Sequence, residues 1–274
     1  MFKEILKNVH EKTPLVHCIT NYVTVNDVAN VLLACGGSPI MADDIRDAED
    51  ITAICSALVI NLGTLNERTI AAMLNTGKVA NKLSHPVVLD PVGAGASKLR
   101  TDTTFEILKK VRLSVIRGNV SEIKTVSRGS GTTKGVDADV SDAITEATLD
   151  EGVAFAKGLS ARTGSIIAMT GAIDIVADPR KAYVVRNGRP QMSKITGTGC
   201  MLTGMIAAYI AANRDSMLDA AAAAVCVMGL SGELAYERAL KNNGGSSTYR
   251  TFIIDAISKM DDATLEGGMK IESR

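Results

Sequence analysis

Thr196-Gly197-Thr198-Gly199-Cys200 is the stretch that decides the fold, and it runs directly into an apolar, Ala-rich segment at 201–212. Two glycines among short polar residues predict a turn that opens a helix. The first backbone N–H groups of that helix then point outward at the positive end of its dipole. Because Gly197 and Gly199 lack a Cβ, a ligand can approach the backbone closely. The pattern favours an anion site, above all a phosphate site, with Cys200 in the first helical turn.

The spacing excludes two familiar phosphate-binding motifs. Leu202 stands where G-x-G-x-x-G requires its third glycine, and G-x-x-x-x-G-K-[ST] occurs nowhere in the chain. A glycine-rich turn before a helix is also common in α/β proteins that bind nothing there. A plain turn therefore stays open as the alternative until the neighbouring residues are considered.

Charge and composition exclude several kinds of partner. Lys plus Arg equal Asp plus Glu at 30 each, and no basic block is present, so nothing indicates nucleic acid binding. Residues 1–7 mix charged and apolar side chains, unlike a signal peptide, and the longest apolar run, at 220–230, is shorter than the roughly 20 residues that cross a bilayer. The cysteines lack C-x-x-C spacing, which disfavours zinc and a disulfide framework. We therefore expect a cytoplasmic protein that binds neither membrane nor nucleic acid.

Short β-rich runs alternate with longer helical ones in the first two thirds of the chain. Strands are predicted at 15–20, 38–41, 57–62, 86–90, 114–117 and 165–170, and helices at 26–34, 45–56, 67–83, 103–112 and 142–162. Continuous apolar strands separated by helices indicate an α/β protein with a mostly parallel sheet and helices on both faces. Residues 173–177 and 182–186 flank a polar turn and predict an antiparallel β-hairpin at one edge.

The remaining segments are predicted to be helical or irregular. Beyond Cys200 we expect helices at 201–213, 217–241 and 248–260, and a polar, frayed tail from Asp261. The Gly- and Ser-containing segment at 127–139 predicts a mobile surface loop or a broken helix. No linker rich in Pro, Gly or Ser and no internal repeat divides the chain, so we expect a single domain over residues 1–274.

Polar residues and glycines follow the predicted strands at their carboxyl ends. The six clusters are 20–23, 41–44, 61–64, 90–95, 117–122 and 170–171. Carboxyl ends of parallel strands lie at one edge of a sheet, where open α/β sheets bind their ligands. Any one cluster is explained by a turn, whereas six on the same edge indicate a site.

Several side chains in these clusters suit a magnesium-bound polyphosphate. Asp90 and Glu122 are carboxylates of the kind that Mg²⁺ takes together with phosphate oxygens, and Arg117 supplies a fixed cation. Met41 and Val23 would add apolar surface for a small heterocycle, although core packing explains them nearly as well. Structural alternatives stay open: an Asp-Pro turn for Asp90, a helix-terminal acid for Glu122, an N-cap for Asn119 and snorkelling for Arg117.

Taken in order, these residues resemble the hydroxyethylthiazole kinases, a family of the ribokinase-like superfamily, over essentially the whole chain. The resemblance rests on Asn21-Tyr22-Val23-Thr24 with Gly37-Ser38-Pro39-Ile40-Met41, on Leu89-Asp90-Pro91-Val92-Gly93-Ala94, on the N-x-x-E sequence Asn119-Val120-Ser121-Glu122, and on the 196–200 loop. It implies a three-layer ribokinase-like fold. It also implies transfer of the ATP γ-phosphoryl group to the hydroxyl of 4-methyl-5-(2-hydroxyethyl)thiazole, in thiamine biosynthesis or salvage.

The resemblance further implies roles for individual residues. Gly197, Thr198, Gly199 and Cys200 would be catalytic; Arg117, Thr170 and Asn119 would contact ATP; Asp90 and Glu122 would organise Mg²⁺; and Met41, Asn21, Val23, Gly63 and Gly197 would line the thiazole pocket. The family also implies a homotrimer with the thiazole site at a subunit boundary, which no pattern in the sequence could show.

The identity of the base is a separate question. Sugar kinases of this fold usually carry Asp at the position of Cys200, where it acts on the acceptor hydroxyl, whereas thiazole kinases carry Cys. A helix N-terminus can lower the pKa of a thiol from about 8.5 into the ~3.5–7.5 range and give a thiolate. Such a thiolate is a weak base, and phosphoryl transfer depends mainly on positioning and charge stabilisation, so the base stays open.

Three competing functions also stay open. NAD(P)H-hydrate dehydratases share the fold and the Gly-rich loop, but they typically place Asp at the position of Cys200. Gly93-Ala94-Gly95 after a strand points to a nicotinamide oxidoreductase, but Ser97 and Lys98 leave the third glycine missing. The third alternative is a non-catalytic binding protein, and the set of carboxylates is the main argument against it.

Overall fold

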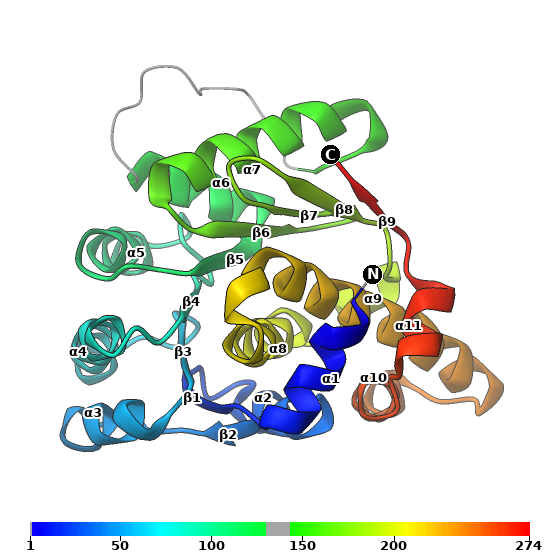
Figure 1. The fold of residues 1–274 in the computed structure, drawn as a ribbon, viewed down its shortest axis with the longest axis horizontal. Coiled ribbons are helices and arrows are strands. Elements are labelled where there is room, and N and C mark those ends of the chain that lie inside the picture. Colours follow the sequence, from blue (N-terminus) through cyan, green and yellow to red (C-terminus); the bar gives the residue numbers. More distant parts are fainter. Residues whose placement is uncertain (1, 130–142) are drawn as a thin grey trace.

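A computed structural model describes residues 2–129 and 143–274. Within this part of the chain, nine strands form one sheet in the order β2-β1-β3-β4-β5-β6-β7-β8-β9 (Figure 1). The strands are β1 (Leu15–Ile19), β2 (Ser38–Ile40), β3 (Ala57–Asn61), β4 (Val87–Asp90), β5 (Val115–Asn119), β6 (Ile166–Thr170), β7 (Asp174–Ala177), β8 (Ala182–Val185) and β9 (Ile271–Ser273). Neighbours from β2 to β6 pair in parallel, and β6 to β9 pair antiparallel. The predicted mostly parallel sheet and the β7–β8 hairpin are confirmed.

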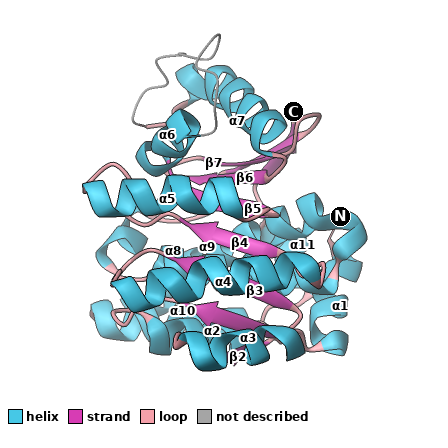
Figure 2. Cartoon of the chain, turned by 90° about the vertical axis from the view of Figure 1, so that its left-hand side faces the viewer, coloured by secondary structure: helices cyan, strands magenta, loops and turns pink. Residues whose placement is uncertain are grey.

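Helices cover both faces of the sheet, which is why its strands are continuous apolar runs. Along β3, Val59 faces one hydrophobic core while Leu58 and Ile60 face the other, the period of two expected of a strand. One layer holds α3 (Ile45–Ile54), α4 (Glu67–Lys82), α5 (Lys98–Lys110), α6 (Val120–Gly129) and α7 (Leu149–Thr163). Figure 2 shows α3, α4 and α5 in front of the strands.

The second layer combines the first two helices of the chain with those of its C-terminal third. Its members are α1 (Lys3–Lys12), α2 (Val25–Ala34), α8 (Thr198–Ala212), α9 (Met217–Lys241), α10 (Ser246–Ser258) and α11 (Asp262–Gly268). The stretch Arg214–Lys241 is long and apolar enough to cross a membrane by length and composition, but 72% of its apolar window is buried inside the protein. Burial of this kind is typical of a core helix, and in Figure 1 α9 lies beside α8 against the sheet.

The C-terminal segment is ordered and ends in a strand. The predictions of a frayed tail from Asp261 and of a wholly helical end of the chain are therefore wrong. The segment forms α11 and then β9, which pairs antiparallel with β8 and becomes the outermost strand beyond the hairpin. Backbone bonds anchor it, including Ala182 N to Arg274 O at 2.9 Å and Arg186 N to Lys270 O at 2.8 Å. A polar strand of three residues has no apolar pattern, so its pairing could not be predicted from periodicity.

Other elements also differ from the prediction. Helix α1 is not among the predicted elements, α5 begins at Lys98 and not at residue 103, and α7 begins at Leu149, after a short 3₁₀ turn at Glu146–Thr148. Helix α6 continues to Gly129, so the loop expected at 127–139 starts as helix. The rest of that loop, and residue 142 of the helix expected at 142–162, lie outside the described residues.

Candidate active site

The start of α8 lies at the carboxyl edge of the parallel strands. Gly197 is its N-cap with φ +89°, in the left-handed region that favours glycine. A Cβ on Gly197 would also lie 2.7 Å from Thr24 Cγ2. Conformation and packing therefore both require glycine at this position. The predicted turn leads into a helix, and the first N–H groups of that helix have no intrahelical partners.

Arg117, from β5, lies across this helix start. Its Nη2 donates to Thr170 Oγ1 at 2.8 Å, and its Nη1 is 3.7 Å from Asp90 Oδ2. A Cβ on Gly199 would collide with the same guanidinium, so the arginine rests against the backbone of the first turn of α8. The side chain is only 13% exposed. The Arg117 guanidinium and the N-terminus of α8 are thus two adjacent sources of positive potential.

Asp90 ends β4 and is fully buried. Its Oδ2 accepts hydrogen bonds from Asn61 Nδ2 at 2.9 Å and Thr203 Oγ1 at 2.8 Å, whereas Oδ1 has no partner in the described part of the chain. Burial raises the pKa of Asp90 to about 6; the charge of Arg117 opposes this rise and that of Glu122 adds to it. Because buried polar atoms are normally paired, the free Oδ1 indicates a place for a cation or a water.

Cys200, in the first turn of α8, faces two side-chain amides. Asn21 Nδ2 and Asn61 Nδ2 each lie 3.3 Å from its Sγ. Burial raises the pKa of the Cys200 thiol and the charge of Asp90 raises it further, while hydrogen bonds from Thr24, Asn21 and Asn61 lower it. The net effect raises the pKa of the thiol above its usual value, so the thiolate that a helix N-terminus can produce is not favoured at this position.

Asn119 and Glu122 cap α6 reciprocally. Asn119 Oδ1 accepts a bond from Glu122 N, and Glu122 Oε2 accepts one from Asn119 N, both at 2.8 Å. Glu122 Oε1 also accepts from Gly93 N at 2.9 Å, which fixes the loop after β4. Both residues border a hollow of about 450 Å³. Asn119 therefore caps α6, as one of the alternatives stated for it predicts. Glu122 connects this cap to the loop that follows Asp90.

A cavity of about 490 Å³ opens beside Arg117. Thr170, Thr198 and Gly199 line its polar end, and its apolar lining includes Leu202, Val225 and Met228. Loop residues 187–190, which follow β8, complete the wall. The combination of apolar walls and a cationic end suits an organic molecule that carries an anionic group.

Comparison with known proteins decides the family. The model of the hydroxyethylthiazole kinase family matches residues 6–263. The chain belongs to the hydroxyethylthiazole kinase family. A hydroxyethylthiazole kinase from Clostridium acetobutylicum is 61% identical over 273 residues, which cover 100% of both chains.

Solved structures agree with this placement. The structure of a hydroxyethylthiazole kinase protein from Pyrococcus horikoshii matches with a TM-score of 0.88 at 32% identity, covering 99% of this chain and 98% of that one. An ADP/ATP-dependent NAD(P)H-hydrate dehydratase from Bacillus subtilis matches with a TM-score of 0.56 at 15% identity, covering 91% of each chain. The second likeness is one of fold alone. The predicted ribokinase-like fold is therefore confirmed.

Of the residues that the family resemblance assigns to the thiazole pocket, Asn21 and Gly63 lie side by side. Gly63 N donates to Asn61 Oδ1 at 2.9 Å, and a Cβ on Gly63 would lie 2.6 Å from the Asn21 side chain. Met41 is partly buried in the hydrophobic cluster that also includes Cys200, whereas Val23 is 58% exposed. The structure thus brings Asn21 and Gly63 into contact and leaves Val23 on the surface.

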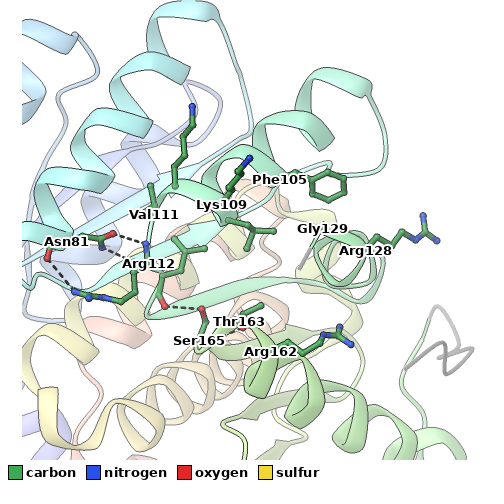
Figure 3. A pocket seen from close by; sticks show the side chains of 13 residues that line it. Asn81, Phe105, Lys109, Val111, Arg112, Arg128, Gly129, Arg162, Thr163 and Ser165 are labelled. Carbon is green, nitrogen blue, oxygen red and sulfur yellow. Dashed lines mark hydrogen bonds between the residues drawn. The ribbon is translucent and has the colours of Figure 1, made fainter. Parts of the chain in front are cut away.

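A larger cavity, of about 820 Å³, lies at the opposite edge of the sheet (Figure 3). Lys109, Arg128 and Arg162 line it at the C-terminal ends of α5, α6 and α7, where basic side chains offset the negative ends of the helix dipoles. None of the site residues predicted for a hydroxyethylthiazole kinase borders this cavity. Its size alone therefore does not make it the active site.

Three further residues contact the predicted site residues, although no role was predicted for any of them from the sequence. Asn61 is the register partner of Asp90 on the neighbouring parallel strand, so the two side chains lie on the same face. Thr203 follows Cys200 by three residues on α8, which puts both on one side of the helix. Thr24 donates to Asn21 Oδ1 through its N at 3.2 Å and its Oγ1 at 3.1 Å. Strand register and helix period would have found the first two.

We expect Cys200→Asp to retain or increase turnover, because the amides of Asn21 and Asn61 that face the sulfur can equally hold a carboxylate. Cys200→Ala should lower kcat by about 10-fold, at or below the low end of the range for loss of a general base. Steady-state kinetics on variants with wild-type melting temperatures would test both. A folded Cys200→Asp protein that binds ATP and turns nothing over would contradict the assignment of the acceptor base to this position.

Proposed function

We propose that this chain transfers the γ-phosphoryl group of ATP to the hydroxyl of 4-methyl-5-(2-hydroxyethyl)thiazole, a reaction of thiamine salvage. The observation that carries the proposal is that Arg117 and the glycine-opened start of α8 line one cavity, with the buried Asp90 3.7 Å behind the guanidinium, in a chain of the hydroxyethylthiazole kinase family. Phosphoryl transfer requires positioned cations and backbone donors more than covalent chemistry. Those are the groups that meet here.

In this proposal the polyphosphate of ATP lies along Arg117, Thr170 and the N-terminus of α8. The guanidinium and the N–H groups of the first helical turn are held in place before substrate arrives, so they stabilise the migrating group without rearrangement. The apolar walls of the cavity would receive the adenine. Asn119 would contact ATP through its amide nitrogen, since its oxygen already accepts the bond from Glu122 N.

Mg²⁺ is proposed as the cofactor, held by Asp90 and Glu122 together with phosphate oxygens and water. The buried Oδ1 of Asp90 fits this role because nothing in the described chain binds it. Each oxygen of Glu122 accepts one backbone N–H and keeps a further lone pair. When bound, the ion would neutralise charge on the β- and γ-phosphates. The chain itself orients the two carboxylates: Asn61 and Thr203 hold Asp90, and the cap of α6 holds Glu122.

The acceptor alcohol would lie against Cys200, with Met41, Asn21, Val23, Gly63 and Gly197 around its ring. Val23 and the adjacent Tyr22 are 58% and 80% exposed. Apolar side chains that serve a binding pocket are usually covered. A homotrimer with the thiazole site at the subunit boundary would cover them, and we propose that assembly, in the cytoplasm, as the working form.

Gly199→Val should lower kcat by about 100- to 1,000-fold, the usual effect of disturbing a fixed donor to a developing charge. The added Cβ collides with the Arg117 guanidinium, which must then leave its place beside α8. Gly158→Val is a matched control, since Gly158 is also helical but has nothing within 4 Å of an added Cβ. Wild-type kinetics for a folded Gly199→Val protein would remove this loop from the mechanism.

One set of assays separates the proposed kinase from its alternatives. The purified chain is incubated with ATP, Mg²⁺ and the thiazole alcohol, and ADP and phosphorylated thiazole are measured by mass spectrometry. Parallel reactions contain hydrated NADH in place of the thiazole, or a nicotinamide dinucleotide with a small alcohol. Phosphorylated thiazole supports the proposal. Turnover of hydrated NADH alone would identify a dehydratase, and turnover of no substrate by a folded protein would favour a binding protein.

A further inference from the structure

The side-chain amide of Asn61 lies at the centre of the site with every hydrogen-bonding position used. Its Oδ1 accepts from Asn21 Nδ2 and from Gly63 N, both at 2.9 Å. Its Nδ2 donates to Asp90 Oδ2 at 2.9 Å and faces Cys200 Sγ at 3.3 Å. The residue is 1% exposed. Both acceptor positions and both donor protons of this buried amide are used, so the amide and its four partners fix one another's orientations.

The neighbours also fix which way this amide points. The backbone N–H of Thr24 donates to Asn21 Oδ1 at 3.2 Å, so Asn21 presents its nitrogen to Asn61. The backbone N–H of Gly63 likewise requires an oxygen, which places Asn61 Oδ1 toward Asn21 and Gly63 and turns its nitrogen toward Asp90. The result is a directed series of hydrogen bonds from Thr24 to Asp90 across the ends of β1, β3 and β4.

We propose that Asn61 is a positioning residue whose two ends serve different halves of the reaction, a proposal that rests on the phosphoryl transfer described above. The oxygen end holds Asn21 and Gly63, on the side that receives the acceptor alcohol. The nitrogen end holds Asp90 and Cys200, where the phosphoryl group is transferred. Through one rigid amide, the acceptor pocket and the transfer centre keep a fixed position relative to each other.

The two ends can be separated by substitution. Asn61→Asp keeps an oxygen for Asn21 and Gly63 but replaces the donor by a second oxygen facing Asp90 Oδ2. It should bind 4-methyl-5-(2-hydroxyethyl)thiazole within about 2-fold of wild type while kcat falls by about 100-fold or more. Asn61→Ala removes both ends, so the dissociation constant for the thiazole should rise by about 10-fold and kcat should fall as well.

Calorimetric titration with the thiazole alcohol in the absence of ATP gives the binding constant, and steady-state kinetics give kcat. Asn81→Asp is the matched control: Asn81 bonds the backbone of Arg112 through both ends of its amide, at 2.8 and 2.7 Å, at the far edge of the sheet. Its binding constant and kcat should equal those of wild type. Phosphorylation of the thiazole by the wild-type chain tests the proposed function separately, because the Asn61 proposal is read from differences between variants.

Either of two results would overturn the proposal. One is a kcat for Asn61→Asp within about 3-fold of wild type, and the other is an equal loss of thiazole binding in Asn61→Asp and Asn61→Ala, as a purely structural residue would give. Thermal unfolding shows whether each variant is folded. Should Asn61→Asp not fold, Asn61→Ala decides, because wild-type thiazole binding or wild-type kcat in that variant contradicts the proposal.

Discussion

Asp90→Asn is expected to lower kcat by at least about 1,000-fold, since a carboxylate on a catalytic metal contributes several kcal/mol to the stabilisation of transition-state charge. The substitution keeps an oxygen to accept the bonds from Asn61 and Thr203. It removes the negative charge and the free acceptor at Oδ1. We therefore expect the geometry of the site to survive while the proposed binding of Mg²⁺ with ATP is lost.

The same variant should be more stable than wild type at neutral and higher pH. The pKa of Asp90 is raised from 3.8 to about 6 by burial, so the folded chain disfavours the ionised form that prevails at pH 8. A difference of two pKa units corresponds to about 3 kcal/mol. This penalty is fully present above pH 6 and disappears below pH 4, where the carboxyl is neutral in both folded and unfolded chains. The stabilising effect of Asp90→Asn should follow the same course.

Differential scanning calorimetry at pH 4 and pH 8, together with steady-state kinetics, would test both halves of this expectation. Asp219→Asn serves as a control, because Asp219 is half-exposed, accepts a bond from Tyr183 OH at 2.6 Å and makes a charge contact with Lys181, away from the proposed site. Its kcat should be that of wild type. A lower melting temperature for Asp90→Asn at pH 8 would show that the carboxylate stabilises the fold, contrary to this account.

The sheet and the edge that carries the site could be predicted because both follow from local pattern. Apolar runs such as residues 57–62 and 86–90 mark buried parallel strands, and topology then places the residues after each run at one edge. The β9 strand could not be predicted in this way. It is held by backbone pairing with β8, and backbone groups are the same in every residue.

The details of the site depended on contacts between distant segments. A helix N-terminus alone would lower the pKa of the Cys200 thiol, whereas burial and Asp90, which is 110 residues away in the sequence, raise it. Asn61 shows the same limit. Its residue type and strand end are visible in the sequence, but its importance comes from the register that sets it beside Asp90 and from the packing of α8 against both.

Arg117→Ala should lower kcat by about 100- to 1,000-fold, the range for removing one preorganised donor to a developing negative charge. The variant also removes the one cation within 4 Å of Asp90 among the described residues, at 3.7 Å, and leaves that buried carboxylate uncompensated. We therefore expect a lower melting temperature in addition to slow turnover. Arg117→Lys retains the charge but not the planar fork that reaches Thr170 and Asp90 together, so its kcat should lie between those of alanine and wild type.

The combination of Arg117→Ala with Asp90→Asn distinguishes the two roles of the arginine. If the lower stability of Arg117→Ala comes from the uncompensated charge of Asp90, the double variant should regain the lost stability. Its kcat should stay low, because the cation proposed to contact ATP is still missing. Arg46→Ala is the control, since Arg46 pairs with Asp44 at a surface where its side chain is 86% exposed. Equal melting temperatures for Arg117→Ala and the double variant would refute the coupling between Arg117 and Asp90. A kcat within about 5-fold of wild type for Arg117→Ala would take the arginine out of phosphoryl transfer.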